Sequence, residues 1–600
     1  MSRPEGEIRS VGGAPSPWSP MLRSLVLVLL LTGTAQAQFV LTVPGVYQLY
    51  HDVVYGADGA VYVAGSFSGT TDFDPTDGPD ADDTLTSSGG ADYFVARYGS
   101  AGALQWVIGF GSSDGAFNDF GPRLAADGAR VYVSGNFGGT ADFDPGAGTA
   151  LRTSLGGYDA FLAAYDAATG AFVWADAFGS TGLDFASSVA VDEQRVYLGG
   201  AFEDTIDLDP GSGTASHTDG TALGSAFLAA YDTATGAYEW SNAFEVGSDR
   251  EVRVDVDAGR VFIVGQLRTE MDADPGPGEV LLAFQGGTAD AFVAAYGAET
   301  GAYDWAFALG SSGSETSRAV LLHDGRLFVA GVLSGGTVDF DPGPAVEART
   351  AGMGEQLYLA AYTAADGSLV WVDALTEGGL SYTFPQGLAA DGNRVYVTGA
   401  YSLTVDFDPG PGTAEHTWSG GTPSNWDVFL AAYDAASGAY RWANALPASP
   451  EGIGSAVAVS GPFVSVVGGF PATLDLDPGP GEDIQTGGGL FLAPYDAATG
   501  AYRADVASEP SVEPRGLVLR AAPNPASGLA TLTLTLDGPR SVAVSVVDVL
   551  GREVDRLHSG PLSAGTHLLA LDTSALPPGL YVVRATAGRA TVSERLTVVR

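Results

Sequence analysis

The sequence predicts an all-β protein, in which a seven-bladed β-propeller is followed by a small immunoglobulin-like β-sandwich. Three observations carry this prediction. The marker Asp-x-Asp-Pro recurs seven times, at intervals of 65 to 70 residues. Short runs with period-2 alternation lie between the markers, separated by Gly and Pro turns. The composition, with 84 Gly, 33 Pro and only 16% charged residues, fits short strands joined by tight turns.

Two markers define the repeat. The first begins at Asp72, Asp142, Asp207, Asp272, Asp339, Asp406 and Asp475. The second is a hairpin that ends on Trp106, Trp174, Trp240, Trp305, Trp371 and Trp442, and in the seventh copy on Ala504. Each repeat offers four strands, and four-stranded units repeated radially form a propeller, with seven units inside the usual range for closure. A β-solenoid is the alternative, but its repeat is much shorter.

The ends of the repeat region do not match. The seventh copy lacks its Trp, and residues 38–44 precede the first repeat without belonging to one. We therefore predict that residues 38–44 pair into the last repeat and close the ring.

The start of the chain has the features of a secretory signal. Arg23 precedes an apolar run over 25–31, and Ala35-Gln36-Ala37 supplies small residues for cleavage before Gln38. The run is shorter than the roughly 20 residues of a membrane span, so a retained anchor is the lesser alternative. The sequence predicts an N-terminal extension and signal peptide over 1–37, with Met21 as the start, and no stable membrane span.

The end of the chain forms a separate predicted domain. The propeller is expected over 38–506, a linker over 507–517 and the sandwich over 518–600. Four features come in order: Pro523-Asn524-Pro525, the Val-Asp-Val-Leu-Gly-Arg-Glu-Val segment from Val547, the Gly565 turn and the Gly579-Leu580-Tyr581 step. This set resembles the type A C-terminal sorting domain of type IX secretion substrates. The resemblance implies export by the Sec route, contact with the type IX machinery, and an extracellular or outer-membrane-surface location. An ordinary immunoglobulin-like module is the alternative.

The repeats themselves resemble the β-propeller repeats of exported bacterial proteins and, more distantly, the blades of pyrroloquinoline-quinone dehydrogenases. Both resemblances imply architecture. The second does not extend to chemistry, because those enzymes typically use a vicinal disulfide and basic residues around the quinone, and this chain has neither Cys nor Lys.

Charge is unevenly distributed. The whole chain carries −44, residues 38–515 carry 63 acids and 16 Arg (−47), and residues 516–600 carry 6 acids and 8 Arg (+2). Nucleic-acid binding needs a basic footprint and is excluded. The acidity keeps the repeat region soluble and attracts divalent cations.

The Asp pairs are candidate Ca²⁺ ligands, because hard carboxylate oxygens suit that ion. The structural alternative is that Pro and Gly set a turn while Asp accepts backbone hydrogen bonds, and repetition in every copy favours it. The candidate metal residues are Asp72, Asp74, Asp142, Asp144, Asp207, Asp209, Asp272, Asp274, Asp339, Asp341, Asp406, Asp408, Asp475 and Asp477.

Function has to be sought where the repeats differ. The longest departures are 76–91 and 417–427, and the second carries the additional Trp418 and Trp426 as ligand-binding candidates. No catalytic motif and no cofactor site other than possible Ca²⁺ is evident. We expect a non-enzymatic binding or adhesion module for an extracellular glycan or protein. An extracellular polysaccharide hydrolase or lyase that uses propeller carboxylates is the alternative.

Overall fold

The computed structural model describes residues 39–503 and 517–599, with gaps at 45, 47–50, 75–82, 113–120, 221–223, 248–250, 258, 353, 376–380, 420–424, 523–525, 527, 537–539, 549–551, 564, 578 and 588–589. The predicted signal peptide, Ala504, nearly all of the predicted linker and the Pro523-Asn524-Pro525 opening lie outside the described residues.

The repeat region folds into four-stranded antiparallel units, here numbered as sheets, each built from consecutive stretches of chain except the last. The short strands Thr140–Asp142 and Leu151–Thr153 extend sheet 1, and sheets 5 and 6 are joined into one larger sheet. From the innermost strand outward, sheet 1 has β2 (Asp52–Tyr55), β3 (Val61–Asp72), β4 (Thr84–Tyr98) and β5 (Leu104–Ser112); sheet 2 has β6 (Arg123–Ala126), β7 (Arg130–Phe137), β10 (Asp159–Asp166) and β11 (Phe172–Phe178); sheet 3 has β12 (Phe185–Val191), β13 (Arg195–Phe202), β16 (Ser225–Asp232) and β17 (Tyr238–Phe244); sheet 4 has β18 (Arg253–Asp257), β19 (Arg260–Leu267), β22 (Asp290–Gly297) and β23 (Tyr303–Leu309).

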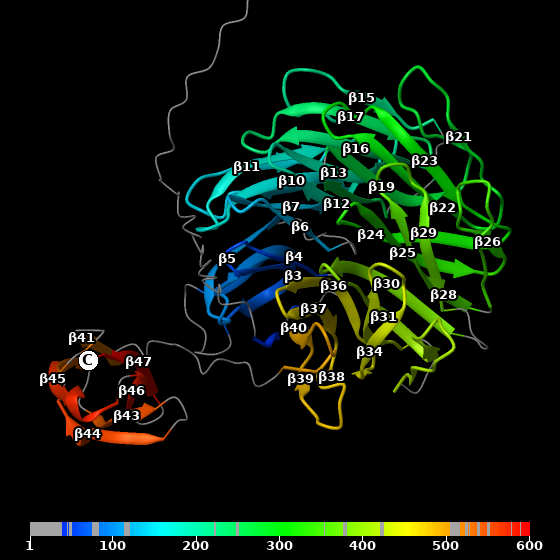
Figure 1. The fold of residues 1–600 in the computed structure, drawn as a ribbon. Helices are drawn as coiled ribbons and strands as arrows, with labels where there is room; N and C mark the ends of the chain where they lie inside the picture. The colour runs from blue at the N-terminus through cyan, green and yellow to red at the C-terminus, as the bar shows by residue number, and fades with distance from the viewer. Residues whose placement is uncertain are drawn as a thin grey trace, which may run out of the picture. The chain divides into compact units, whose positions relative to one another are not determined.

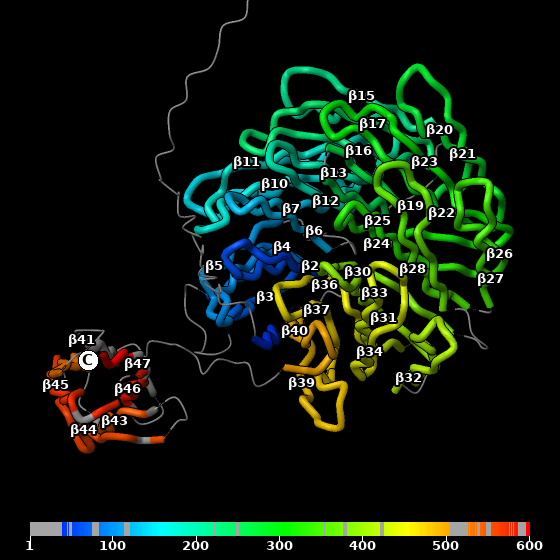
Figure 2. Tube along the Cα trace, in the orientation of Figure 1, coloured from blue at the N-terminus to red at the C-terminus, as the bar shows by residue number. Residues whose placement is uncertain are grey.

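Sheet 5 has β24 (Ser314–His323), β25 (Arg326–Ser334), β28 (Gly354–Thr363) and β29 (Leu369–Ala374); sheet 6 has β30 (Ser381–Ala390), β31 (Arg394–Asp406), β33 (Asp427–Asp434) and β34 (Tyr440–Leu446); sheet 7 has β36 (Ile453–Ser460), β37 (Phe463–Phe470), β40 (Gly489–Asp496) and β1 (Leu41–Pro44). The sheets follow one another in chain order around a ring, which Figure 1 shows as a ribbon and Figure 2 as a Cα trace. The fold is a β-propeller, as predicted.

Short strands carry the Asp-x-Asp-Pro loops at the edges of the sheets. We call these two-stranded units the Asp hairpins; in sheet 1 the unit is the far end of the β3–β4 pair, and in sheet 6 β32 pairs with the end of β31. The other short strands are β8 (Thr140–Asp142), β9 (Leu151–Thr153), β14 (Thr205–Asp207), β15 (Ser216–Thr218), β20 (Met271–Asp272), β21 (Leu281–Leu282), β26 (Thr337–Asp339), β27 (Ala348–Thr350), β32 (Glu415–Thr417), β35 (Ala448–Ser449), β38 (Thr473–Asp475) and β39 (Ile484–Thr486).

The N-terminal strand closes the ring. β1 pairs antiparallel with β40, from Leu41 opposite Leu492 to Pro44 opposite Gly489. In the other sheets a Trp of the outer strand lies over a turn Gly of the next sheet; for example, a Cβ on Gly170 would lie 2.9 Å from the Trp106 ring. On Gly102 of sheet 1 the ring is that of Phe39, with its Cγ 2.7 Å from such a Cβ. Phe39 therefore stands where the seventh repeat lacks its Trp, and the prediction of closure by residues 38–44 is confirmed for residues 39–44.

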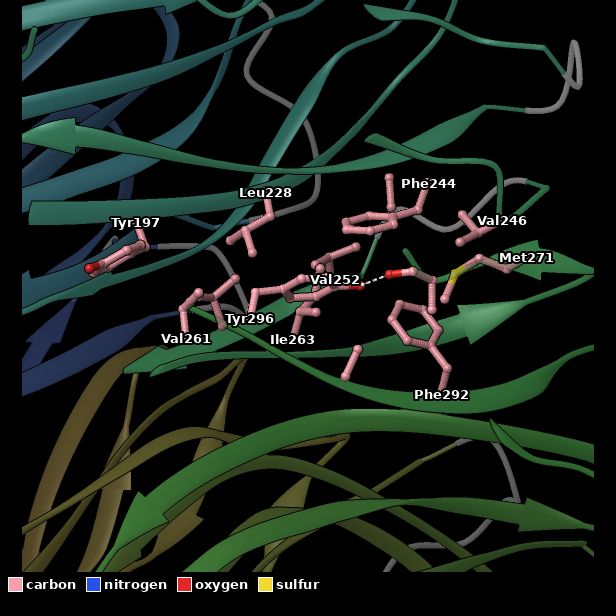
Figure 3. Packing of buried hydrophobic residues seen from close by; sticks show 14 of the residues in the cluster. Tyr197, Leu228, Phe244, Val246, Val252, Val261, Ile263, Met271, Phe292 and Tyr296 are labelled. Carbon is pink, nitrogen blue, oxygen red and sulfur yellow. Dashed lines mark hydrogen bonds between the residues drawn. The ribbon is translucent and has the colours of Figure 1, made fainter. Parts of the chain in front are cut away.

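The core is divided among the joints between sheets. A hydrophobic cluster lies between each pair of neighbouring sheets, including sheets 7 and 1. Figure 3 shows the cluster between sheets 3 and 4, where Leu228 and Phe244 face Ile263 and Phe292. Full burial of one such side chain stabilises the fold by roughly 1.5–3 kcal/mol. Stability is therefore spread over the ring, as in other repeat architectures.

The C-terminal domain is a sandwich of two sheets. One sheet has β41 (Leu517–Ala522), β42 (Leu529–Leu536) and β45 (Gly565–Asp572), and the other has β44 (Glu553–Leu562), β43 (Arg540–Asp548), β46 (Gly579–Ala587) and β47 (Ala590–Val598). A short 3-10 helix, η2, spans Thr573–Ala575. The inward residues of both sheets alternate along their strands and share one hydrophobic cluster, which includes Leu532, Leu534, Val544 and Val583.

Candidate functional site

The Asp pairs lie in the loops of the Asp hairpins. In the second copy Asp142 Oδ1 accepts hydrogen bonds from Asp144 N (3.1 Å) and Ala150 N (2.7 Å), so it ties the two ends of the loop together. Asp144 Oδ1 accepts from Gly146 N (2.8 Å). The first Asp makes the same two contacts at Asp207, Asp272, Asp339, Asp406 and Asp475. In the first copy Asp72 Oδ1 likewise accepts from Asp74 N.

The residue between the two Asp side chains is buried, and its carbonyl accepts a hydrogen bond from a buried tyrosine. Tyr165 Oη donates to Phe143 O at 3.0 Å, and Tyr296 Oη to Ala273 O at 3.0 Å (Figure 3). The other copies use Tyr98, Tyr231, Tyr362, Tyr433 and Tyr495. Within the described residues no three His, Asp or Glu side chains come together as metal ligands. The Asp pairs thus remain separate from one another, each holding its own loop; their use as Ca²⁺ ligands stays a prediction.

The repeated Trp side chains lie at the joints between sheets. Each indole Nε1 donates to a backbone carbonyl of the next sheet, as Trp174 does to Thr233 O (3.2 Å) and Trp240 to Ala298 O (3.0 Å). The remaining copies are Trp106, Trp305, Trp371 and Trp442. This geometry is that of packing residues with a satisfied polar group.

Trp418 and Trp426 have different surroundings. Trp418 packs against the cluster between sheets 5 and 6, and its Nε1 is buried without a hydrogen-bond partner in the described part of the chain. Trp426 is half-buried and meets the edge of Phe384, with ring centroids 4.7 Å apart, and of Tyr382, with centroids 6.1 Å apart. The two candidates do not form one platform, and the residues 420–424 between them lie outside the description.

Trp426 belongs to a group of side chains that we call the Arg318 cluster: Glu251, Arg318, Glu355, Tyr382, Phe384 and Trp426. Arg318 lies over the Phe384 ring, with Cζ 5.6 Å from the centroid, and its Nη1 lies 3.1 Å from Glu251 Oε2. An arginine above an aromatic face gains a cation–π attraction. The cluster combines an aromatic surface with charged hydrogen-bonding groups. In the sequence, no other repeat has an arginine at the position of Arg318.

The chain positions Arg318 through a β-bulge. The pairing of β24 with β25 shifts between Ser317 and Ala319, which leaves Arg318 as the extra residue. The corresponding bulges of sheets 3, 6 and 7 leave Ser187, Gln386 and Ser455. Sheets 5 and 6 are also joined directly, since Gly354 and Glu355 of β28 pair in parallel with Ser381 and Tyr382 of β30. This joint brings residues of both sheets to Arg318.

The two glutamates of the cluster differ electrostatically. Burial alone would raise the pKa of Glu251, but Arg318, Arg253 and Arg123 hold this pKa below its ordinary value. Burial raises the pKa of Glu355, and Arg318 offsets only part of that effect. Glu251 is therefore a fixed anion, whereas Glu355 takes up a proton more readily.

The cluster adjoins a central cavity of about 500 Å³, lined by the innermost strands of all the sheets, β2, β6, β12, β18, β24, β30 and β36. Charged residues of its wall include Asp52, Arg123, Arg253 and Asp255. Asp52 and Asp255 each cap a free backbone N–H of the neighbouring sheet: Asp52 Oδ2 accepts from Leu124 N (2.9 Å), and Asp255 Oδ2 from Leu322 N (2.6 Å). Burial raises the pKa of Asp255 to about 6.

Sequence reasoning identified Trp426 but missed Glu251, Arg318, Phe384 and the cavity arginines. A signal was present, because the propeller region has few cations and Arg318 replaces Ser or Gln at one bulge. Position-by-position differences between the repeats reveal this arginine, whereas the features that the repeats share do not.

Two family models match parts of the chain. Residues 521–599 match the secretion system C-terminal sorting domain, and residues 158–342 match the model described as outer membrane protein assembly factor BamB. No curated protein matches the chain. No helix of the described residues is long and apolar enough to cross a membrane.

Among solved structures, the chain is similar to the quinohemoprotein alcohol dehydrogenase from Comamonas testosteroni, with 13% identity and a TM-score of 0.33 over 91% of this chain and 78% of that one. It is also similar to the Dos1 propeller, with 8% identity and a TM-score of 0.32 over 78% of this chain and 98% of that one. The match at residues 521–599 shows a type IX secretion C-terminal sorting domain after the β-propeller described above, and that domain indicates export of the chain to the cell surface or extracellular space.

Proposed function

We propose that the chain is a seven-bladed propeller delivered by type IX secretion as a non-enzymatic binding or adhesion module. The pairing of four strands in each of sheets 1 to 7, with β1 completing the last, supports the blade count. The two-sheet C-terminal domain supports an immunoglobulin-like sandwich over about 518–600, after a linker. Processing of a signal peptide before Gln38 would leave Phe39 and β1 at the start of the mature chain.

The observation that carries the binding function is the Arg318 cluster. Trp426, Phe384 and Tyr382 supply half-buried aromatic surface, and Arg318 with Glu251 and Glu355 supplies planar hydrogen-bonding groups beside it. Such a combination suits a glycan, because sugar rings offer apolar faces for stacking and hydroxyls at their edges. The site depends on side chains from sheets 4, 5 and 6, and the sequence places no counterpart of Arg318 in the other sheets.

The test is binding of the purified mature chain to a glycan array, followed by titration of the best ligand. We expect W426A to lose at least tenfold in affinity and W426F to lose less. W418F is the matched control: it removes a buried N–H but keeps the packing ring, and it should bind as the unsubstituted protein does. Equal loss in W426A and W418F, or no loss in W426A, would place the ligand elsewhere.

One observation favours the alternative, a polysaccharide hydrolase or lyase. Glu355, with its raised pKa, and Glu251, with its lowered pKa, flank the same arginine, and two carboxyls whose pKa values are shifted in opposite directions are what acid and base roles require. Incubation with polysaccharides that the array identifies, with reducing ends and unsaturated products measured, decides this. Product formation that E355Q abolishes without loss of binding would establish the enzyme; its absence leaves the binding module.

A further inference from the structure

One ring of residues in the wall of the central cavity is polar on one side and small and apolar on the other. Each innermost strand contributes one residue to this ring, at the same place in its pairing with the second strand of its sheet. Around the ring these are Asp52, Arg123, Ser188, Arg253, Ala319, Gly387 and Ala456, and all of them line the cavity. Sheets 1 to 4 therefore present polar groups, whereas sheets 5 to 7 present small residues that leave space.

Three of these four polar side chains already make hydrogen bonds within the protein. Asp52 accepts from Leu124 N, as described above. Ser188 Oγ accepts from Val254 N at 3.0 Å. Arg253 is 8% exposed, and its Nη1 donates to Ser187 O (3.1 Å) and Val252 O (3.3 Å).

Arg123 differs from these neighbours. Its half-buried guanidinium makes no hydrogen bond and no ion pair with any residue of the described structure, although it interacts at longer range with Asp52 and Glu251. A guanidinium offers five N–H donors in one plane, and donors that face a cavity without acceptors are costly unless water or a ligand satisfies them.

The local charge favours an anion. Arg123, Arg253 and Arg318 act together on Glu251, so that three cations surround one fixed carboxylate. Asp52 and Asp255 are the acids of the described cavity wall, and burial disfavours the charged form of both. In a chain of net charge −44, three Arg side chains against one fixed carboxylate make a small positive region, which a bound anion would offset.

We propose that Arg123 binds the carboxylate of an acidic sugar in the central cavity. A planar monoanion matches the guanidinium with two parallel hydrogen bonds. The sugar hydroxyls would meet the unpaired edges of the innermost strands and Gln386, and the small residues of sheets 5 to 7 make room for the ring. The inference rests on the function proposed above and names the class of ligand for the central cavity beside the Arg318 cluster.

The test is calorimetric titration of the full mature chain with glucuronate, glucose and glucose 6-phosphate. We expect glucuronate to bind at least tenfold more tightly than glucose and more tightly than glucose 6-phosphate, with affinity falling as salt is added. R123Q should lose at least tenfold for glucuronate only, and R123K should lose less. R441Q is the matched control, because Arg441 is half-exposed on β34 and pairs with Asp434 instead of the cavity.

Each other result would overturn the proposal. Equal binding of glucose and glucuronate, no binding of any of the three, or unchanged affinity in R123Q with an unchanged melting temperature would exclude a carboxylate site at Arg123. Preference for glucose 6-phosphate would make the site a phosphate site. If glycans from the array still bind, W426A abolishes that binding and R123Q does not, this inference fails while the proposed function stands.

Discussion

The Asp hairpins repeat one another almost residue for residue, whereas the innermost strands differ from sheet to sheet. In the hairpins the carboxylates, the buried middle residue and the tyrosine hydroxyl recur with the same partners. In the innermost strands Arg123, Arg253 and Arg318 have no counterparts in the remaining sheets. The difference teaches that repetition in this chain marks residues that hold the fold, and departure from it marks candidates for binding. Substitutions at the two kinds of position should therefore separate stability from affinity.

The largest effect is expected at the closing strand. Deletion of residues 39–44 removes β1 and Phe39 together and leaves the outer edge of β40 unpaired. We expect the deletion to lower the free energy of unfolding more than F39A alone does. F39A removes a buried aromatic ring and should cost about 3 kcal/mol. Thermal unfolding measures both. F39W is the control, since Trp stands at this place in the other sheets and should be tolerated; a deletion that melted at the original temperature would refute closure by β1.

A smaller effect is expected in the Asp hairpins. D142A removes the acceptor of two loop N–H groups and should cost about 1–2 kcal/mol, without changing ligand affinity. Urea unfolding gives the first quantity and titration of a bound glycan the second. Loss of affinity in D142A would break the rule that repeated residues are structural.

The same hairpins decide the question of Ca²⁺. Because each first Asp already holds its own loop, we expect millimolar Ca²⁺ after EDTA treatment to shift the melting temperature no more than Mg²⁺ does, through screening alone. A rise with Ca²⁺ that Mg²⁺ does not reproduce, and that D142A and D144A together diminish, would make the Asp pairs ion sites.

A pH effect is expected at two joints between sheets, where fully buried carboxyls face one another: Asp184 beside Asp159, and Glu315 beside Asp290. Burial raises the pKa of Asp184 and of Glu315 to about 7, and the facing carboxylate adds to this. Hydrogen bonds from Ser180 and Ser311 oppose the shift.

Because the folded-state pKa lies above the unfolded-state pKa, the folded protein binds these protons more strongly. Their contribution to stability is complete below about pH 4 and is lost as the pH rises to 7. D184N and E315Q cannot ionise, so both should raise the melting temperature at pH 8 by a few degrees and reduce its change between pH 5 and pH 8. A variant that melts lower at pH 8 and keeps the full pH dependence would contradict this account.

The smallest effect is expected for W418F. Its indole N–H is buried without an acceptor among the residues that the structure describes, so its removal relieves an unsatisfied donor while the ring still packs. We expect a change in unfolding free energy within about 0.5 kcal/mol, in either direction. A loss well beyond this in urea unfolding would show that the N–H has a partner.

The sequence predicted the propeller well because each repeat carries its own local information. The Asp-x-Asp-Pro loop, the Thr-Gly turn and the Trp each act within one sheet or on the next, at a fixed spacing. Closure by residues 39–44 was also predictable, because a segment before the first repeat belonged to no repeat and the seventh repeat lacked its Trp. Trp418 and Trp426 show the limit: they lie eight positions apart, yet one packs in a joint and the other joins the Arg318 cluster.

By itself the sequence determined that the chain is an acidic, exported propeller with a sorting domain, because these properties follow from composition, period and local motifs. Only the tertiary structure decided which residues meet. Glu251, Arg318 and Phe384 come from three sheets, and a bulge in β24 and a parallel bridge between β28 and β30 bring them together. Arg123 faces the cavity because the ring turns seven separate strand edges toward one axis. Such long-range contacts depend on closure of the ring, which no single repeat encodes.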